Sequence, residues 1–183
     1  MGADIALAQE ICTELLEYAA SLPGNAVVGP TTFTRSELRA RILAFEREAF
    51  SAEASGALQT CDMDTTFPVR HIYAPGAVAR EMSLPALHWA IGKIHRHAHL
   101  SFITKGRIAV LTEDGPVVFT APYTFVSTPG CKRVVLALED TIWTTVHITN
   151  ETDLDKIEDE VIAKNYDEFS ALELTVESQG EAP

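Results

Sequence analysis

The spacing of apolar residues divides the chain into a helical start, a long region of short strands and a helical end. From residue 4 to 20, apolar residues recur every three or four positions, which predicts an amphipathic helix. A second helix is predicted over 35–54, because Thr34 and Glu37 have the spacing of a capping box and an apolar stripe follows. Residues 1–60 are therefore expected to form a helical N-terminal segment.

From about residue 69 the pattern changes to short segments rich in β-branched and aromatic residues. Glycine, proline and aspartate separate these segments as turn signals, and no helical stretch lies between them. The predicted strands are 69–74, 77–84, 87–94, 99–104, 107–112, 116–120, 124–127, 133–138 and 141–149. Many short strands without intervening helices are typical of an antiparallel sandwich or barrel. We predict a mainly β fold with one β domain over 61–150.

After Asn150 the pattern becomes helical again. Thr152 and Asp155 have the spacing of a helix start, and the apolar residues that follow fall on one side. We predict a C-terminal helix within 151–170 and a flexible tail over 171–183.

Composition excludes several classes of function. The formal net charge of −12 disfavours nucleic-acid binding, whose affinity rests on lysine and arginine. No apolar run approaches the roughly 18 to 20 residues of a membrane span, and the first residues lack the pattern of a secretion signal, so we predict a cytoplasmic protein. Cys12, Cys61 and Cys131 are too scattered to indicate a disulfide framework. The segment 61–64, Cys-Asp-Met-Asp, has the look of a metal-binding snippet but is more simply a polar loop.

Half of the six histidines fall within five residues, at His95, His97 and His99. Side chains alternate between faces along a strand, so the three imidazoles would share one face if this stretch were extended. Neutral imidazoles suit zinc, iron, nickel or copper, and the sequence does not choose among these metals. We predict a divalent transition metal at this cluster. The simpler alternative is that the histidines line a polar cavity or face solvent.

Short strands around a histidine row, followed by Lys105-Gly106-Arg107, resemble the cupin superfamily over about residues 68–149. The resemblance implies a small double-sheet jelly roll. The first cupin motif runs from Gly through His-x-His and Glu to a second Gly, and its two His and Glu ligate metal. Counting back from Gly106 puts His99 at the place of the Glu and His95 at the second His. Starting instead from His95 and His97 leaves Ser101 or Phe102 where the Glu belongs.

The second cupin motif normally supplies another histidine after Pro-x-Gly-x-x. Here the residues from Pro129 run Pro-Gly-Cys-Lys-Arg and put Arg133 at that place. A guanidinium stays protonated and cannot ligate a cation, but it recognises carboxylates and phosphates through two parallel hydrogen bonds. The remaining ligand is expected to be His147, with Glu139 or Glu81 as alternatives.

We therefore predict a metal-binding protein that acts on a small anionic molecule, of the oxygenase or isomerase type if it is an enzyme. The predicted metal ligands are His95, His97, His99 and His147, and the predicted substrate-binding residues are Arg133, Glu81, Tyr73 and Trp143. Core packing is the simpler role for Trp143. No nucleic-acid or membrane partner is expected, and cupins are commonly dimers, so the resemblance favours a homodimer.

Two other functions remain open. One is a non-catalytic binding or assembly module in which the N-terminal helices mediate oligomerisation. The other is a metal-free isomerase or epimerase, in which a histidine base works with Tyr73 or Tyr123 as acid. The turns Lys-Gly-Arg and Pro-Gly-x-Lys-Arg, the run Glu-Asp-Thr-x-Trp and the acidic helix also resemble uncharacterised cupin-fold proteins common in bacteriophage genomes. That resemblance implies a virus-encoded protein in the host cytoplasm.

Overall fold

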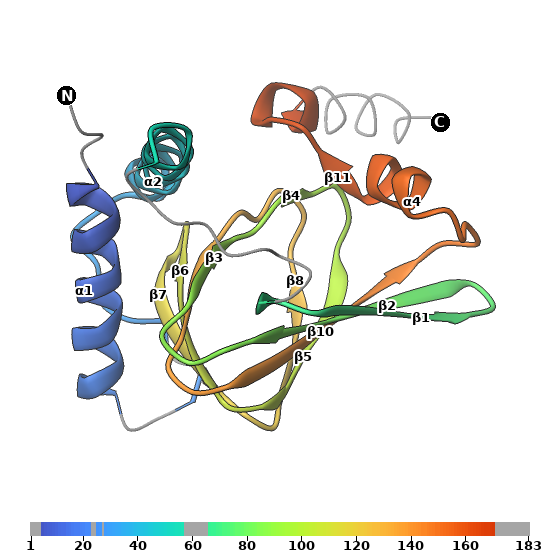
Figure 1. The fold of residues 1–183 in the computed structure, drawn as a ribbon, viewed down its shortest axis with the longest axis horizontal. Coiled ribbons are helices and arrows are strands. Elements are labelled where there is room, and N and C mark those ends of the chain that lie inside the picture. Colours follow the sequence, from blue (N-terminus) through green and yellow to red (C-terminus); the bar gives the residue numbers. More distant parts are fainter. Residues whose placement is uncertain (1–4, 23–24, 27, 57–65, 171–183) are drawn as a thin grey trace, which may run out of the picture.

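The computed structural model describes residues 5–22, 25–26, 28–56 and 66–170 (Figure 1). Two helices come first, α1 (Ala6–Ser21) and α2 (Arg35–Ala54). The strands then follow as β1 (Val69–Ala74), β2 (Ala77–Leu84), β3 (Trp89–Ile91), β4 (Ile94–His95), β5 (His99–Lys105), β6 (Arg107–Thr112), β7 (Gly115–Thr120), β8 (Tyr123–Ser127), β9 (Val134–Ala137) and β10 (Thr141–Ile148). The chain ends with α4 (Leu154–Val161), β11 (Ile162–Ala163) and a helical stretch at 166–170.

Two antiparallel sheets form the body of the molecule. One has the order β1-β2-β10-β5-β8 and the other β3-β9-β6-β7, so strands distant in sequence become neighbours. Apolar side chains from both sheets meet in one buried core: Phe67, Leu84, Ile103, Ile108, Val110, Val117, Phe119, Val135, Ala137 and Trp143. The prediction of a mainly β, double-sheet jelly roll with flanking helices is confirmed.

The N-terminal helices cover the outer face of the four-stranded sheet (Figure 1). Their apolar stripes, which include Ile11, Leu15, Ile42 and Phe45, pack against side chains of β6, β7 and β9. Burying each of these large side chains stabilises the folded state by about 1.5 to 3 kcal/mol. The apolar stripes of these helices are therefore buried against the barrel of their own chain.

The start of α2 has the predicted capping box. The Thr34 hydroxyl accepts a hydrogen bond from the backbone N–H of Glu37, and the Glu37 carboxylate accepts one from the N–H of Thr34. Both bonds satisfy donors that the first turn of a helix leaves free.

A buried carboxylate joins three distant parts of the chain. Glu113, in the turn between β6 and β7, accepts hydrogen bonds from Arg35 and Arg39 of α2 and from the Tyr166 hydroxyl. Burial alone would raise the pKa of this carboxyl, but the three donors outweigh it, so the pKa of Glu113 is lowered. We call Glu113, Arg35, Arg39 and Tyr166 the Glu113 cluster.

The C-terminal segment departs from the single predicted helix. Helix α4 begins after Asp153, whose carboxylate accepts from the backbone N–H groups of Asp155 and Lys156, rather than at a Thr152 cap. It ends at Val161 because the next two residues form β11 and pair with β4. Ala163 is buried there with Ile94 and Phe169, and this burial favours the extended pairing over a longer helix.

The predicted strand over 87–94 is also interrupted. Leu87 has a positive φ of 62°, and the ladder is limited to β3 and the two residues of β4. Between them Gly92 leaves the strand pattern and donates its N–H to the carbonyl of Arg133. The segment 61–64 and the predicted tail over 171–183 lie outside the described residues. None of the helices described here is both long and apolar enough to cross a bilayer.

Candidate metal centre

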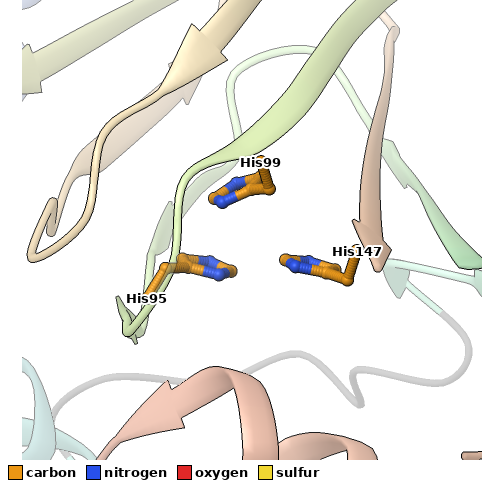
Figure 2. Close-up of side chains that lie close together, drawn as sticks. All are labelled: His95, His99 and His147. Carbon is orange, nitrogen blue, oxygen red and sulfur yellow. The ribbon is translucent and has the colours of Figure 1, made fainter. Parts of the chain in front are cut away.

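Three histidines from three strands converge inside one end of the barrel (Figure 2). His95 ends β4, His99 begins β5, and His147 lies near the end of β10. Their potential ligand nitrogens all lie within 4.8 Å of one another, and within the described parts of the chain this is the one group of its kind. The ring centroids are 4.2 Å apart for His95 and His99, and 4.6 Å for His99 and His147.

Strand alternation brings His99 and His147 together. Leu100 of β5 pairs with Val146 of β10, and both of these residues point away from the barrel interior, so their neighbours His99 and His147 point inward. His147 also pairs across with Val78 of β2, and His99 with Ser127 of β8. The site therefore lies on the inner face of the five-stranded sheet.

His95 reaches the site by a different route, and His97 does not join it. The chain bends over residues 96–98 between β4 and β5, so the stretch is not one extended strand and the expected alternation fails. His97 is exposed, although it is near enough to lower the pKa of His147. The expectation that His95, His97 and His99 share one face is therefore corrected to His95 and His99 alone.

The backbone around His95 is held on both sides. Strand β11 pairs with β4 so that Ile162 lies opposite His95, and the carbonyl of His95 accepts a hydrogen bond from Gly130 at 2.8 Å. Arg96 donates to the carbonyl of Ile162 and forms an ion pair with Glu168. The C-terminal segment thus fixes the position of the first histidine.

All three imidazoles are held neutral. Burial, followed by the nearby histidines and arginines, lowers the pKa of His95 to about 2. Burial is also the main reason why the pKa of His147 falls to about 4, and it lowers the pKa of His99. A neutral imidazole keeps the lone pair that a metal ion needs.

Hydrogen bonding leaves these lone pairs available. The Nδ1 of His99 lies 3.3 Å from the carbonyl oxygen of His97, an arrangement that fixes the ring and leaves Nε2 for a ligand bond. The Nδ1 of His95 is buried and has no hydrogen-bond partner among the described residues. An unpaired buried polar atom costs about 1 to 3 kcal/mol, which a metal ion would offset. Three neutral imidazoles with no carboxylate among them fit zinc, iron, nickel or copper and leave coordination positions open.

Arg133 lies beside the histidines. Its Nη1 donates to the Ser127 hydroxyl at 3.1 Å, and that hydroxyl lies 2.9 Å from the hydroxyl of Ser101. The guanidinium also lies 5.8 Å from the ring centroid of Phe125. Its positive charge contributes to the lowered pKa values of His95 and His99, as expected for a cation facing the same space.

Sequence reasoning missed a second arginine, Arg80. It lies on β2 directly opposite Thr145 of β10, one inward position along the strand from the pair formed by Val78 and His147. Its charge contributes to the lowered pKa of both His95 and His147, which places it in the same space. The signal was in the sequence, because Arg80 occupies the same strand face as Val78, Met82 and Leu84.

The structure brings neither Glu81 nor Tyr73 into the histidine cluster. Glu81 lies on the outer face of β2, where it forms an ion pair with Arg70 at 2.9 Å. Tyr73 is 45% exposed, and the alternative ligand Glu139 is exposed. Trp143 shares a face with His147 but lies four residues, about 13 Å, along β10. It is 7% exposed and makes edge contacts with Phe119 and Phe125 in the core.

A metal-free isomerase would need a histidine base close to a tyrosine acid, and a carboxylate that orients the histidine; the described residues do not bring these groups together. Tyr123 packs on Phe119 and lies four residues along β8 from Ser127, the residue opposite His99. Within the described residues, none of the three clustered histidines hydrogen-bonds a carboxylate that would orient it as a base.

Several solved structures are similar to this chain. KdgF from Halomonas sp. is 14% identical and aligns over 55% of this chain and 93% of its own, with a TM-score of 0.43. An RmlC-like cupin from Shewanella frigidimarina is 14% identical over 51% of this chain and 85% of its own, with a TM-score of 0.42. A Cupin 2 conserved barrel domain protein from Salinispora arenicola is 11% identical over 49% and 86%, with a TM-score of 0.39. No protein-family model and no curated protein matches the sequence.

Proposed function

We propose that this chain is a metal-binding, cupin-like protein that acts on a small anionic molecule inside its barrel. His95, His99 and His147 would hold a divalent transition metal, and Arg133 would anchor the anion. The observation that carries the proposal is the convergence of three neutral imidazoles with a buried, unpartnered Nδ1 on His95. Because His97 is exposed, it is left out of the proposed ligand set.

A bound metal of this kind supplies Lewis acidity to a ligand oxygen or lowers the pKa of a bound water. The protein's own side chains supply binding and orientation. The Ser127 hydroxyl holds Arg133 in place, so that its remaining N–H groups can receive a carboxylate or phosphate. An oxygenase or an isomerase would both use this arrangement, and the reaction type stays a prediction.

Elemental analysis of the purified protein tests the metal centre. We expect stoichiometric metal in the unaltered chain, and its loss in His99→Ala and His147→Ala. His97→Ala is the matched control, because it removes an exposed imidazole from the same stretch and is expected to retain the metal. Metal-free wild-type protein, or equal loss from all three variants, would contradict the proposal.

A second copy of the chain is the proposed partner. The outer face of the five-stranded sheet carries a row of apolar side chains that crosses every strand: Ile72, Ala79, Val146, Leu100 and Val126. Ile72, Leu100 and Val126 are 44, 46 and 60% exposed. A row of this kind is self-complementary about a twofold axis. Because each chain carries a net charge of −12, two copies would repel through their charged faces, so an apolar face is the better contact between them. The cytoplasmic location and the bacteriophage origin stay predictions.

A further inference from the structure

We propose that the ligand of this site carries two anionic groups, one bound by Arg133 and the other by Arg80, on opposite sides of the three histidines. The inference rests on the proposed metal centre and specifies the class of molecule that it receives. A short dicarboxylate is the simplest member of that class.

The strand order places the two arginines on either side of the cluster. Across the sheet from β2 to β8, the inner-face row that contains the histidines is Val78, His147 on β10, His99 on β5 and then Ser127, which holds Arg133. Arg80 is the next inner-face residue along β2 from Val78. Strands β2 and β8 are three intervals apart, about 14 Å in a flat sheet. The curvature of the barrel and the length of the two arginine side chains both shorten this separation.

Neither guanidinium has a carboxylate partner among the residues that the structure describes. Arg133 donates to Ser127, and the one hydrogen-bond contact of Arg80 is with the sulfur of Met82 at 4.0 Å. Burial lowers the pKa of Arg80, because the charged group has lost water. Glu158 of α4 acts on Arg80 electrostatically, but its carboxylate is bound by Lys93. Among the described residues, these two partly buried guanidinium groups therefore form no direct ion pair with a carboxylate.

The described residues that share the strand row of Arg80 on the inner face are not acidic. The inner-face neighbours in the row of Arg80 are Thr145, Ser101 and Phe125, whose hydroxyls and ring can contact a ligand without repelling an anion. A metal ion at the histidines would add further positive charge. A ligand with one anionic group would neutralise one arginine and leave the other unpaired, whereas two groups satisfy both.

Calorimetry on the metal-loaded full chain tests this proposal. The probes are malonate, succinate and glutarate, compared with acetate, propionate and butyrate. We expect the best diacid to bind at least about 10-fold more tightly than its monoacid, as one additional charge-assisted contact allows. Arg80→Gln should remove this preference and leave monoacid affinity within about 2-fold, because Arg133 remains.

Arg70→Gln is the matched control, since it removes an equal charge from the outer face of the neighbouring strand. Arg80→Lys keeps the charge but loses the two-pronged geometry, so we expect it to lose at least about 3-fold of the preference. If Arg80→Gln does not fold, the Arg80→Lys variant tests whether Arg80 binds the second anionic group. An Arg80 variant that folds and keeps the full diacid preference overturns the inference.

Metal content measured on the same samples separates the two proposals. If the wild type holds no metal, the proposed metal centre fails, and the ratio of diacid to monoacid affinity in metal-free protein then tests the two arginines alone. If metal is present but no diacid is preferred, the metal centre stands and the two-anion ligand is wrong.

Discussion

Ser127 is fully buried and connects Arg133, the proposed anion anchor, to the wall of the barrel. Its hydroxyl accepts from Arg133 and lies beside the hydroxyl of Ser101, so it sets where the guanidinium points. Ser127 pairs with His99 along the strand ladder, but among the described residues its hydroxyl has hydrogen-bond contacts only with Arg133 and Ser101. Metal binding and anion binding should therefore respond differently to its loss.

We expect Ser127→Ala to weaken binding of the preferred anion by about 5-fold, which corresponds to one net hydrogen bond of about 1 kcal/mol. Metal content should stay unchanged. Titration calorimetry and elemental analysis measure the two effects separately. Thr124→Ala, an exposed position on the same strand, is the control and should leave both unchanged. Unaltered anion affinity in Ser127→Ala would argue against Arg133 as the anchor.

At single residues, the sequence allowed the three members of the histidine cluster to be predicted, but not which nearby residues lie outside or beside it. His95 and His99 follow from the count back from Gly106, and His147 from its place on the last predicted strand, since Arg133 cannot ligate a metal. His97 could not be excluded, because the bend at 96–98 depends on pairing between β4 and β11, which are far apart in sequence. Strand alternation could have placed Arg80 on the inner face, but its position beside His147 needed the register between β2 and β10, which no local pattern contains.

Among the elements, the Glu113 cluster joins α2 to the β6–β7 turn and to the helical stretch at 166–170. The Glu113 carboxylate side chain is 3% exposed, while the side chains of Arg35 and Arg39 are 60 and 38% exposed. Solvent therefore weakens the attraction from the arginine side, but the carboxylate itself has little contact with water.

Glu113→Gln should lower the free energy of unfolding at pH 7 by about 2 kcal/mol, after allowance for the exposed arginines. Because the folded pKa of Glu113 lies below its unfolded value, its contribution is present above the unfolded pKa and is lost as the pH falls through the folded pKa. Wild-type stability should thus fall more steeply than that of the variant as the pH falls below about 4.3, the ordinary pKa of a glutamate.

Urea unfolding at pH 7 and pH 3.5 measures both effects. Asp114→Asn is the control, because that carboxylate is 63% exposed and lies 3.5 Å from Arg35. It should change stability by less than about 0.5 kcal/mol. Equal pH dependence in wild type and Glu113→Gln would show that the cluster does not stabilise the fold through its charge.

At the scale of the whole molecule, the succession of short strands along the chain followed from turn signals, whereas their order in the two sheets and the placement of the helices did not. Apolar stripes on two helices are compatible with packing on another subunit or on the same chain. The structure buries them on the four-stranded sheet, and this packing depends on Ala109, Leu111 and Leu136, which a strand pattern assigns only to one face or the other. The exposed sheet is therefore the face left for a partner.

Val126→Lys should disrupt the proposed dimer, because it places a charge in the apolar row. The Val126 side chain is 60% exposed, so the folded chain itself can accept the lysine. Sedimentation analysis should show a dimer for the wild type and a monomer for the variant. Thr13→Lys, on the exposed side of α1, is the control and should remain dimeric. A monomeric wild type at micromolar concentration would rule out this interface.

The pairing of β4 with β11 has a consequence for how the protein is made. His95 lies on a two-residue strand, and its ladder partner Ile162 is synthesised 67 positions later. A nascent chain that has already formed both sheets still lacks the backbone that holds this histidine. We therefore expect high-affinity metal uptake at the proposed centre to begin only after residues 162 and 163 have left the ribosome and paired with β4.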